Sequence, residues 1–129
     1  MCRSWQVRND RPELTADQII EVTRRFRERL GIRKVRFVGG EPLLREDLPD
    51  ILGTISRWCT TEVVTNGTTI TERVAERLVE SGLHQLRVSI DGPEPIHDQL
   101  RGAGSFRRTL EGWRRCDGHE RGAGAPPRS

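Results

Sequence analysis

Hydrophobic and polar residues follow a helical period near the start of the chain. Over 14–30 the apolar side chains recur at steps of three and four residues, at Ile19, Val22, Phe26 and Leu30. Thr15 and Gln18 have the spacing of a capping box at the start of this stretch, and Gly31 stands where a glycine commonly ends a helix. The pattern predicts an amphipathic helix with one apolar face.

Short apolar runs alternate with further helical stretches along the rest of the chain. The runs predict strands over three segments, 33–38, 61–65 and 86–90. Helices are predicted after caps at Asp47 and Thr71, and a last helix over 105–115. The order α-β-α-β-α-β-α is typical of the α/β class, in which right-handed helical crossovers join parallel strands.

The length of the chain fits one domain. Its 129 residues fall within the usual size of a domain, but a complete eight-stranded βα barrel needs about 250 residues. Residues 117–129 have no periodicity and are rich in glycine, alanine and proline. We therefore expect an ordered domain over 1–116, followed by a disordered tail.

Charge and hydropathy exclude several classes of function. No apolar run approaches the roughly 20 residues of a membrane helix, and no secretory signal is present near the start, so we expect a cytoplasmic protein without a membrane partner. The net charge is +3, but arginines alternate with acidic residues and there is no tyrosine. This pattern is typical of solvated helix faces and argues against nucleic-acid binding.

All three predicted strands end in a polar or glycine-rich loop: GGEP, TNGT and SIDG. Each loop alone is ordinary turn chemistry. Ligands of parallel α/β folds bind at the carboxyl ends of the strands, so three such loops in succession predict one shared pocket. Gly39 and Gly40 lack a Cβ and let a ligand approach the backbone. Glu41 has an alternative role as a partner of the following helix dipole.

The third strand has a polar face. Its aliphatic residues alternate with Arg87, Ser89 and Asp91. In a two-layer antiparallel protein this alternation would indicate that one face of the sheet is exposed to solvent. The βα context favours polar side chains that line an interior.

Three segments carry a resemblance to a known family. VRFVGGEPLLREDLPDIL, VVTNGTTIT and LRVSIDGPEPIHDQLRGAGSFRRTLEG resemble the second, third and fourth strand regions of radical S-adenosylmethionine enzymes. The last segment is most similar to the branch with SPASM-type C-terminal domains, which matures peptides or cofactors. The resemblance covers roughly 1–113. It implies about three strands of an incomplete TIM-like barrel, with the first strand missing, and thus a fragment truncated at both ends.

The resemblance also implies an iron–sulfur cluster. In the family a CxxxCxxC motif holds a 4Fe-4S cluster through three thiolates, and Cys2 stands where the third cysteine is expected. Cys59 is not expected to be a ligand, because its position six residues before Thr65 places it about 20 Å from the loops at the opposite edge of the sheet. Cys116 is expected at the end of the last helix, also away from the cluster.

The resemblance assigns S-adenosyl-L-methionine to the three loops. The methionyl amino group would be contacted, largely through backbone atoms, by Gly39, Gly40, Glu41 and Pro42. Thr65 and Asn66 would line the pocket, and Ser89 would bind the ribose or the carboxylate. Asp91 would face the same cavity, and Arg101 would pair with the methionyl carboxylate.

In complete members of the family, an electron from the reduced cluster cleaves adenosylmethionine to methionine and a 5′-deoxyadenosyl radical, which abstracts hydrogen from a small-molecule or peptide substrate. One cysteine in place of three implies that this chain alone is inactive. Two alternatives remain: a non-catalytic βα module that binds a nucleotide or adenosyl ligand, and a gene remnant. The sequence indicates neither the substrate nor an oligomeric state.

Overall fold

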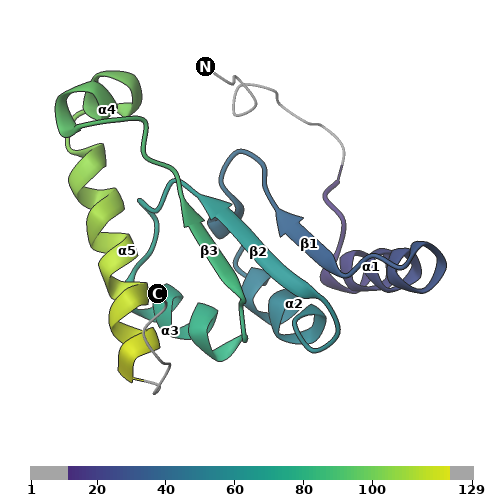
Figure 1. The fold of residues 1–129 in the computed structure, drawn as a ribbon. Coiled ribbons are helices and arrows are strands. Elements are labelled where there is room, and N and C mark those ends of the chain that lie inside the picture. The colour runs from purple at the N-terminus through teal and green to yellow at the C-terminus, as the bar shows by residue number, and fades with distance from the viewer. Residues whose placement is uncertain (1–11, 123–129) are drawn as a thin grey trace.

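Parallel strands and helices alternate in the computed structural model, which describes residues 12–122. The elements follow in the order α1 (Ala16–Leu30), β1 (Lys34–Phe37), the 3-10 helix η2 (Pro42–Leu44), α2 (Leu48–Ile55), β2 (Thr60–Thr65), α3 (Glu72–Glu80), β3 (Gln85–Val88), α4 (Glu94–Arg101) and α5 (Ser105–Gly122). The three strands form one sheet in the order β1-β2-β3 (Figure 1). The predicted α/β class and parallel sheet are confirmed.

The register aligns the carboxyl ends of the strands. In the β1–β2 pair Phe37 lies opposite Val63, and in the β2–β3 pair Thr65 lies opposite Val88. Each strand is followed by a loop at this edge, and the three strand arrows in Figure 1 point the same way. The topology therefore places the GGEP, TNG and SIDG loops at one end of the sheet.

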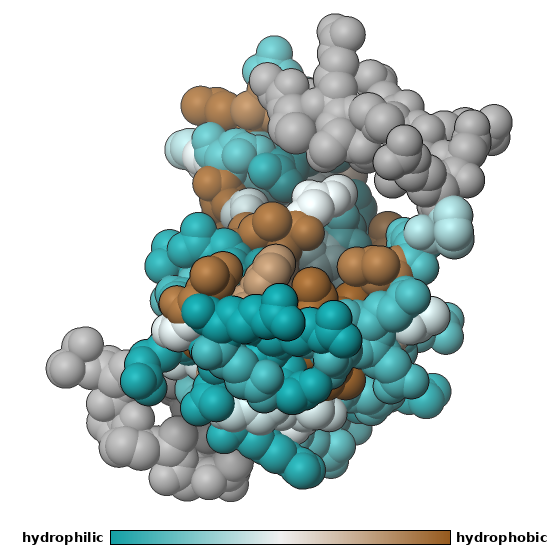
Figure 2. All heavy atoms as spheres, turned by 90° about the vertical axis from the view of Figure 1, so that its right-hand side faces the viewer, coloured by the Kyte–Doolittle hydropathy of each residue, from teal (hydrophilic) through white to brown (hydrophobic). Residues whose placement is uncertain are grey.

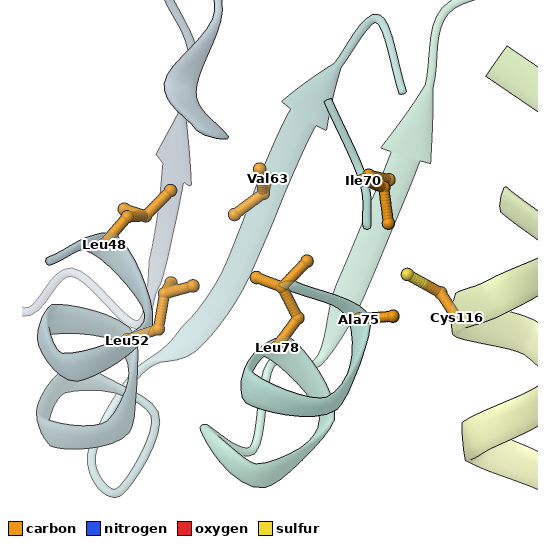
Figure 3. Packing of buried hydrophobic residues seen from close by; sticks show 7 residues of the cluster. All are labelled: Leu48, Leu52, Val63, Ile70, Ala75, Leu78 and Cys116. Atoms are coloured by element: carbon orange, nitrogen blue, oxygen red, sulfur yellow. The ribbon is translucent and has the colours of Figure 1, made fainter. Parts of the chain in front are cut away.

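Helices α2 and α3 cover one face of the sheet. Figure 3 shows the side chains of the main core cluster, which point toward one another from α2, β2, the segment before α3, α3 and α5: Leu48, Leu52, Val63, Ile70, Ala75, Leu78 and Cys116. A second cluster joins α2 to α1 and β1 through Ile51, Ile55 and Cys59. Burial of these aliphatic side chains is the main favourable term that holds the helices on the sheet.

The predicted helix ends follow from local hydrogen bonds. Thr15 and Gln18 form the predicted capping box, with the Gln18 amide 3.2 Å from Thr15 Oγ1 and the Thr15 amide 2.9 Å from Gln18 Oε1. Gly31 ends α1 at a φ of 68°, which favours glycine. Thr71 caps α3 by accepting the Val74 amide at 3.3 Å.

Asp47 precedes α2 as predicted, but its side chain does not cap the helix. Its carboxylate instead accepts the Nε–H of Arg45 at 2.6 Å. The prediction of an Asp47 side-chain cap is therefore wrong. Nε and Nη2 of Arg45 each donate to one oxygen of that carboxylate, and such a bidentate pair of ionised groups is stronger than a single bond to a backbone amide.

Helix α5 extends beyond the predicted 105–115 and reaches Gly122. Residues 117–122 are thus helical rather than part of a disordered tail; the rest of that predicted tail, 123–129, lies outside the described residues. Contacts with distant segments explain the extension. Arg115 donates to the Ile70 carbonyl at 2.7 Å, and His119 lies 2.7 Å from Glu72. Tertiary packing has overridden a composition with poor helix propensity.

Helix α1 presents apolar side chains to solvent beside β1, an outer strand of the sheet that the described residues form. Ile19 and Ile20 pack against the second core cluster, whereas the side of α1 with Val22, Phe26 and Leu30 is exposed. Figure 2 views the molecule from this side and shows hydrophobic residues in a band across it. None of the described helices has the length and apolar character to cross a membrane.

Candidate functional site

The carboxylate of Glu41 links the first two strand-end loops. It accepts hydrogen bonds from the Leu43 amide at 3.1 Å, the Thr65 hydroxyl at 2.6 Å and the Asn66 amide at 2.8 Å. The first bond caps the 3-10 helix η2, which Pro42 begins. Glu41 therefore caps η2 rather than α2, and it also ties the GGEP loop to the end of β2.

The backbone at Gly39 and Gly40 faces open space. Both residues are exposed, and a Cβ built on either one has no other atom within 4 Å. A ligand can therefore approach the backbone closely at this point. The backbone of this loop is therefore accessible from solvent at both glycines.

The TNG loop after β2 is held by its own hydrogen bonds and by α5. Asn66 Oδ1 accepts the amide and the hydroxyl of Thr68 at 2.8 and 2.7 Å. The Asn66 carbonyl accepts the hydroxyl of Thr109, a fully buried residue of α5, at 2.8 Å. The loop is thus tied to α5, and its Asn66 side-chain oxygen is engaged by Thr68 within the loop.

The SIDG loop after β3 makes one more hydrogen bond to β2 before the chain turns away from the sheet. The Ser89 amide donates to the Thr65 carbonyl at 2.9 Å, so Ser89 lies beside the TNG loop. Asp91 and Arg101 form an ion pair, in which Arg101 Nη2 is 3.1 Å from Asp91 Oδ1 and Nε bonds the other oxygen. This pair brings α4 back to the strand end.

The electrostatics of this pair agree with its geometry. The Arg101 guanidinium lowers the pKa of Asp91 through the hydrogen bond, against the opposing effect of burial. Asp91 raises the pKa of Arg101, and the charge of Glu41 adds to the same shift. Arg101 therefore lies within electrostatic reach of the GGEP loop, but its charge is shared with Asp91.

His97 was not anticipated and organises the third loop. It is fully buried; its Nδ1 accepts the Asp91 amide at 3.3 Å, and its Nε2 lies 3.3 Å from Ser105 Oγ. Its ring meets that of Phe106 edge-on at 5.7 Å. Helix α4, which carries His97, was missed because it has only eight residues with a proline in its first turn.

The face of the sheet opposite α2 and α3 holds a buried carboxylate among three cations. Glu62 is fully buried, and it pairs with Lys34 at 2.5 Å, with Arg36 at 3.2 Å and with Arg87. The paired Lys34 ammonium is the largest cause that lowers the pKa of Glu62, against the opposing effect of burial. The three cations are about half exposed, so the face presents an excess of positive charge to solvent.

Sequence reasoning placed Arg87 on this polar face but missed Lys34, Arg36 and Glu62. For Lys34 and Arg36 the available signal was their alternation with Val35 and Phe37 in β1. Their meeting depends on the strand register, in which Arg36 lies opposite Glu62.

The described residues do not provide a site for an iron–sulfur cluster. Within 12–122, no group of three or more His, Cys, Asp or Glu side chains is placed to hold a metal ion. Cys59 is buried just before β2, at the amino end of the sheet, and Cys116 belongs to the core. Cys59 therefore lies away from the loops, as expected, whereas Cys116 lies within α5 and packs in the core rather than at the end of the last helix, as the sequence had predicted. Cys2 lies outside the described residues.

Comparison with known proteins identifies the class. Residues 1–120 match the Radical SAM superfamily, and the chain belongs to this superfamily of enzymes. Its fold is that of part of a radical SAM barrel.

Among curated relatives, a probable GTP 3′,8-cyclase of Archaeoglobus fulgidus is 37% identical over 112 residues, which cover 86% of this chain and 37% of the relative. A GTP 3′,8-cyclase of Tolumonas auensis is 41% identical over 103 residues, or 77% of this chain and 30% of the relative. A probable GTP 3′,8-cyclase of Methanocella arvoryzae is 42% identical over 61% of this chain and 25% of the relative. The chain thus spans about a third of the length of these relatives.

Proposed function

We propose that this chain forms part of the adenosylmethionine-binding core of a radical SAM enzyme. The observation that carries the proposal is the meeting of three loops at one sheet edge, with the open glycine backbone of Gly39 and Gly40 beside the loops at Asn66 and Ser89. Membership in the superfamily implies both adenosylmethionine and an iron–sulfur cluster. The open backbone at Gly39 and Gly40 supports the first of these two groups, because it leaves room for a ligand.

The residues of the edge have distinct roles in this proposal. Backbone atoms at Gly39 and Gly40 bind the methionyl amino group, and Ser89 binds the ribose or the carboxylate. Arg101, positioned by Asp91, attracts the methionyl carboxylate. When bound beside a reduced cluster, adenosylmethionine supplies the oxidising radical for hydrogen abstraction, and the protein supplies orientation and exclusion of water.

Replacement of Gly40 by valine tests this assignment. A Cβ at Gly40 meets no protein atom within 4 Å, so Gly40→Val is expected to fold, while its side chain occupies the ligand space. We expect calorimetry to show loss of adenosylmethionine binding. Gly118→Val is the matched control, because Gly118 is exposed on α5 with no atom near its Cβ. A folded Gly40→Val variant with unchanged affinity would contradict the assignment.

The cationic sheet face favours an anionic substrate for the whole protein. Lys34, Arg36 and Arg87 place three positive charges around one buried carboxylate, and the relatives are named GTP 3′,8-cyclases. A nucleoside triphosphate such as GTP has the complementary charge. We expect a fluorescent GTP analogue to bind the chain, and Arg36→Gln to weaken it. The exposed Arg33→Gln, just before β1, should bind like wild type. Equal binding by Arg36→Gln would argue against this substrate class.

Two further features stay predictions. The likeness of the SIDG segment to the branch with SPASM-type C-terminal domains is the first of these. The expected inactivity of the chain alone rests on Cys2 as the single candidate cluster ligand, and it would be contradicted by cleavage of adenosylmethionine above a protein-free control after anaerobic reconstitution.

A further inference from the structure

Both oxygens of the Glu41 carboxylate are engaged by the protein itself. Oε1 accepts the Leu43 amide at 3.1 Å and the Thr65 hydroxyl at 2.6 Å, and Oε2 accepts the Asn66 amide at 2.8 Å. The side chain is thus directed into the frame of the loops, away from the open space at Gly39 and Gly40. A group held in this way fixes the positions of its neighbours.

The bonds of Glu41 lead into a wider network. The Thr65 hydroxyl, which donates to Glu41, accepts the Gly67 amide at 3.0 Å. The Asn66 carbonyl accepts the buried hydroxyl of Thr109 on α5 at 2.8 Å. Through Glu41 the exposed glycine backbone is therefore connected to β2 and α5, which both contribute side chains to the main core cluster.

We propose that Glu41 is a positioning residue of the adenosylmethionine site: its side chain does not touch the ligand but sets the spacing between the GGEP and TNG loops. The inference rests on the proposed function, since it names what holds that site in shape. Two loops that bind one ligand need a fixed separation, and displacement of a binding group by about 1 Å weakens its contribution sharply.

Glu41→Gln is the sharpest perturbation because it keeps the shape of the side chain. A carboxamide has one acceptor oxygen and one NH2 donor. If the oxygen faces Leu43 and Thr65, the NH2 faces the Asn66 amide; if it is turned around, the NH2 faces Leu43. Either orientation leaves at least one donor opposite another donor, so the link between the loops is broken.

The matched control is Glu46→Gln. Glu46 lies on the same connection and is exposed, so this variant removes the same charge without a change in the link. A second pair, Thr65→Val and Thr65→Ser, removes and retains the hydroxyl that donates to Glu41. This pair decides the question even if Glu41→Gln does not fold.

Two measurements test the proposal on the full chain. Without ligand, hydrogen exchange by NMR should show the Asn66 amide exchanging roughly 10-fold faster in Glu41→Gln, with the Val63 amide in the middle of β2 unchanged. With ligand, calorimetry should show adenosylmethionine affinity reduced roughly 10-fold or more in Glu41→Gln and in Thr65→Val, and near wild type in Glu46→Gln and Thr65→Ser.

The outcomes separate the two claims. If the wild type binds adenosylmethionine and folded Glu41→Gln or Thr65→Val binds it equally tightly, the positioning role is wrong. The proposed function is then unaffected. Equal loss of affinity in Glu46→Gln also overturns the positioning role, because the effect would then come from charge. Absence of adenosylmethionine binding by the wild type overturns the proposed function, and this inference with it.

Discussion

Replacement of Gly112 by alanine should destabilise the protein, although the same change at Gly118 on the same helix should stabilise it. A Cβ built on Gly112 would lie 2.2 Å from the Gly67 carbonyl oxygen and 3.0 Å from Ile70 Cβ. The first contact is with backbone of the TNG loop, which cannot move aside as a flexible side chain can. A Cβ on Gly118 has no atom within 4 Å.

The magnitude follows from two opposing effects. Alanine is favoured over glycine inside a helix by up to about 1 kcal/mol. Overpacking of a filled site typically costs about 1–3 kcal/mol, and a 2.2 Å approach to backbone belongs at the upper end. We therefore expect Gly112→Ala to lower the free energy of unfolding by about 2 kcal/mol, and Gly118→Ala to raise it by up to about 1 kcal/mol.

Urea denaturation followed by circular dichroism measures both changes. With a slope of about 2 kcal/mol per molar urea, the Gly112→Ala midpoint should fall by about 1 M. Because the new methyl group also presses on the TNG loop, adenosylmethionine affinity should fall in the same variant. Equal stability of the two alanine variants would refute the close packing of α5 on this loop.

Two other stability predictions follow from the structure. Thr71→Ala should lower the free energy of unfolding by about 1 kcal/mol in the same urea assay, because it removes the side-chain cap that accepts the Val74 amide; a midpoint equal to that of wild type would contradict the cap. The pKa of Asp91 is lowered mainly by the Arg101 hydrogen bond, and the pKa of Asp98 is lowered mainly by backbone amides. Both carboxylates therefore stabilise the folded protein at neutral pH. This contribution is lost as the pH falls below their ordinary pKa of 3.8. The urea midpoint of Asp91→Asn should accordingly vary less than that of wild type below pH 4, and an identical pH profile would contradict the ion pair.

The sequence predicted those features that depend on local pattern. Periodicity located the strands to within one or two residues at each end, and the alternation of helices and strands predicted the parallel sheet. The shared edge followed, because parallel strands that run the same way bring the loops at their carboxyl ends together. The capping box at Thr15 and Gln18 needed only neighbouring residues and was also correct.

The features that sequence reasoning missed depend on contacts between distant segments. The hydrogen-bond partners of the Glu41 carboxylate could not be predicted, because one of them, Thr65, lies 24 residues away in the sequence. The burial of Glu62 under three cations depends on the strand register. Helix α5 continues past 115 because Arg115 and His119 find partners around α3. In each case the decisive energy comes from packing that periodicity does not encode.

The central claim is that adenosylmethionine binds at the carboxyl edge of this sheet. Titration of the 15N-labelled chain with adenosylmethionine, followed by amide NMR, tests it most directly. The account predicts that the largest shift changes appear at Gly40, Asn66 and Ser89, with little change at Cys59 before β2 or at Gly118 on α5. Saturable shifts confined to the opposite end of the sheet, or no shifts at all, would contradict it.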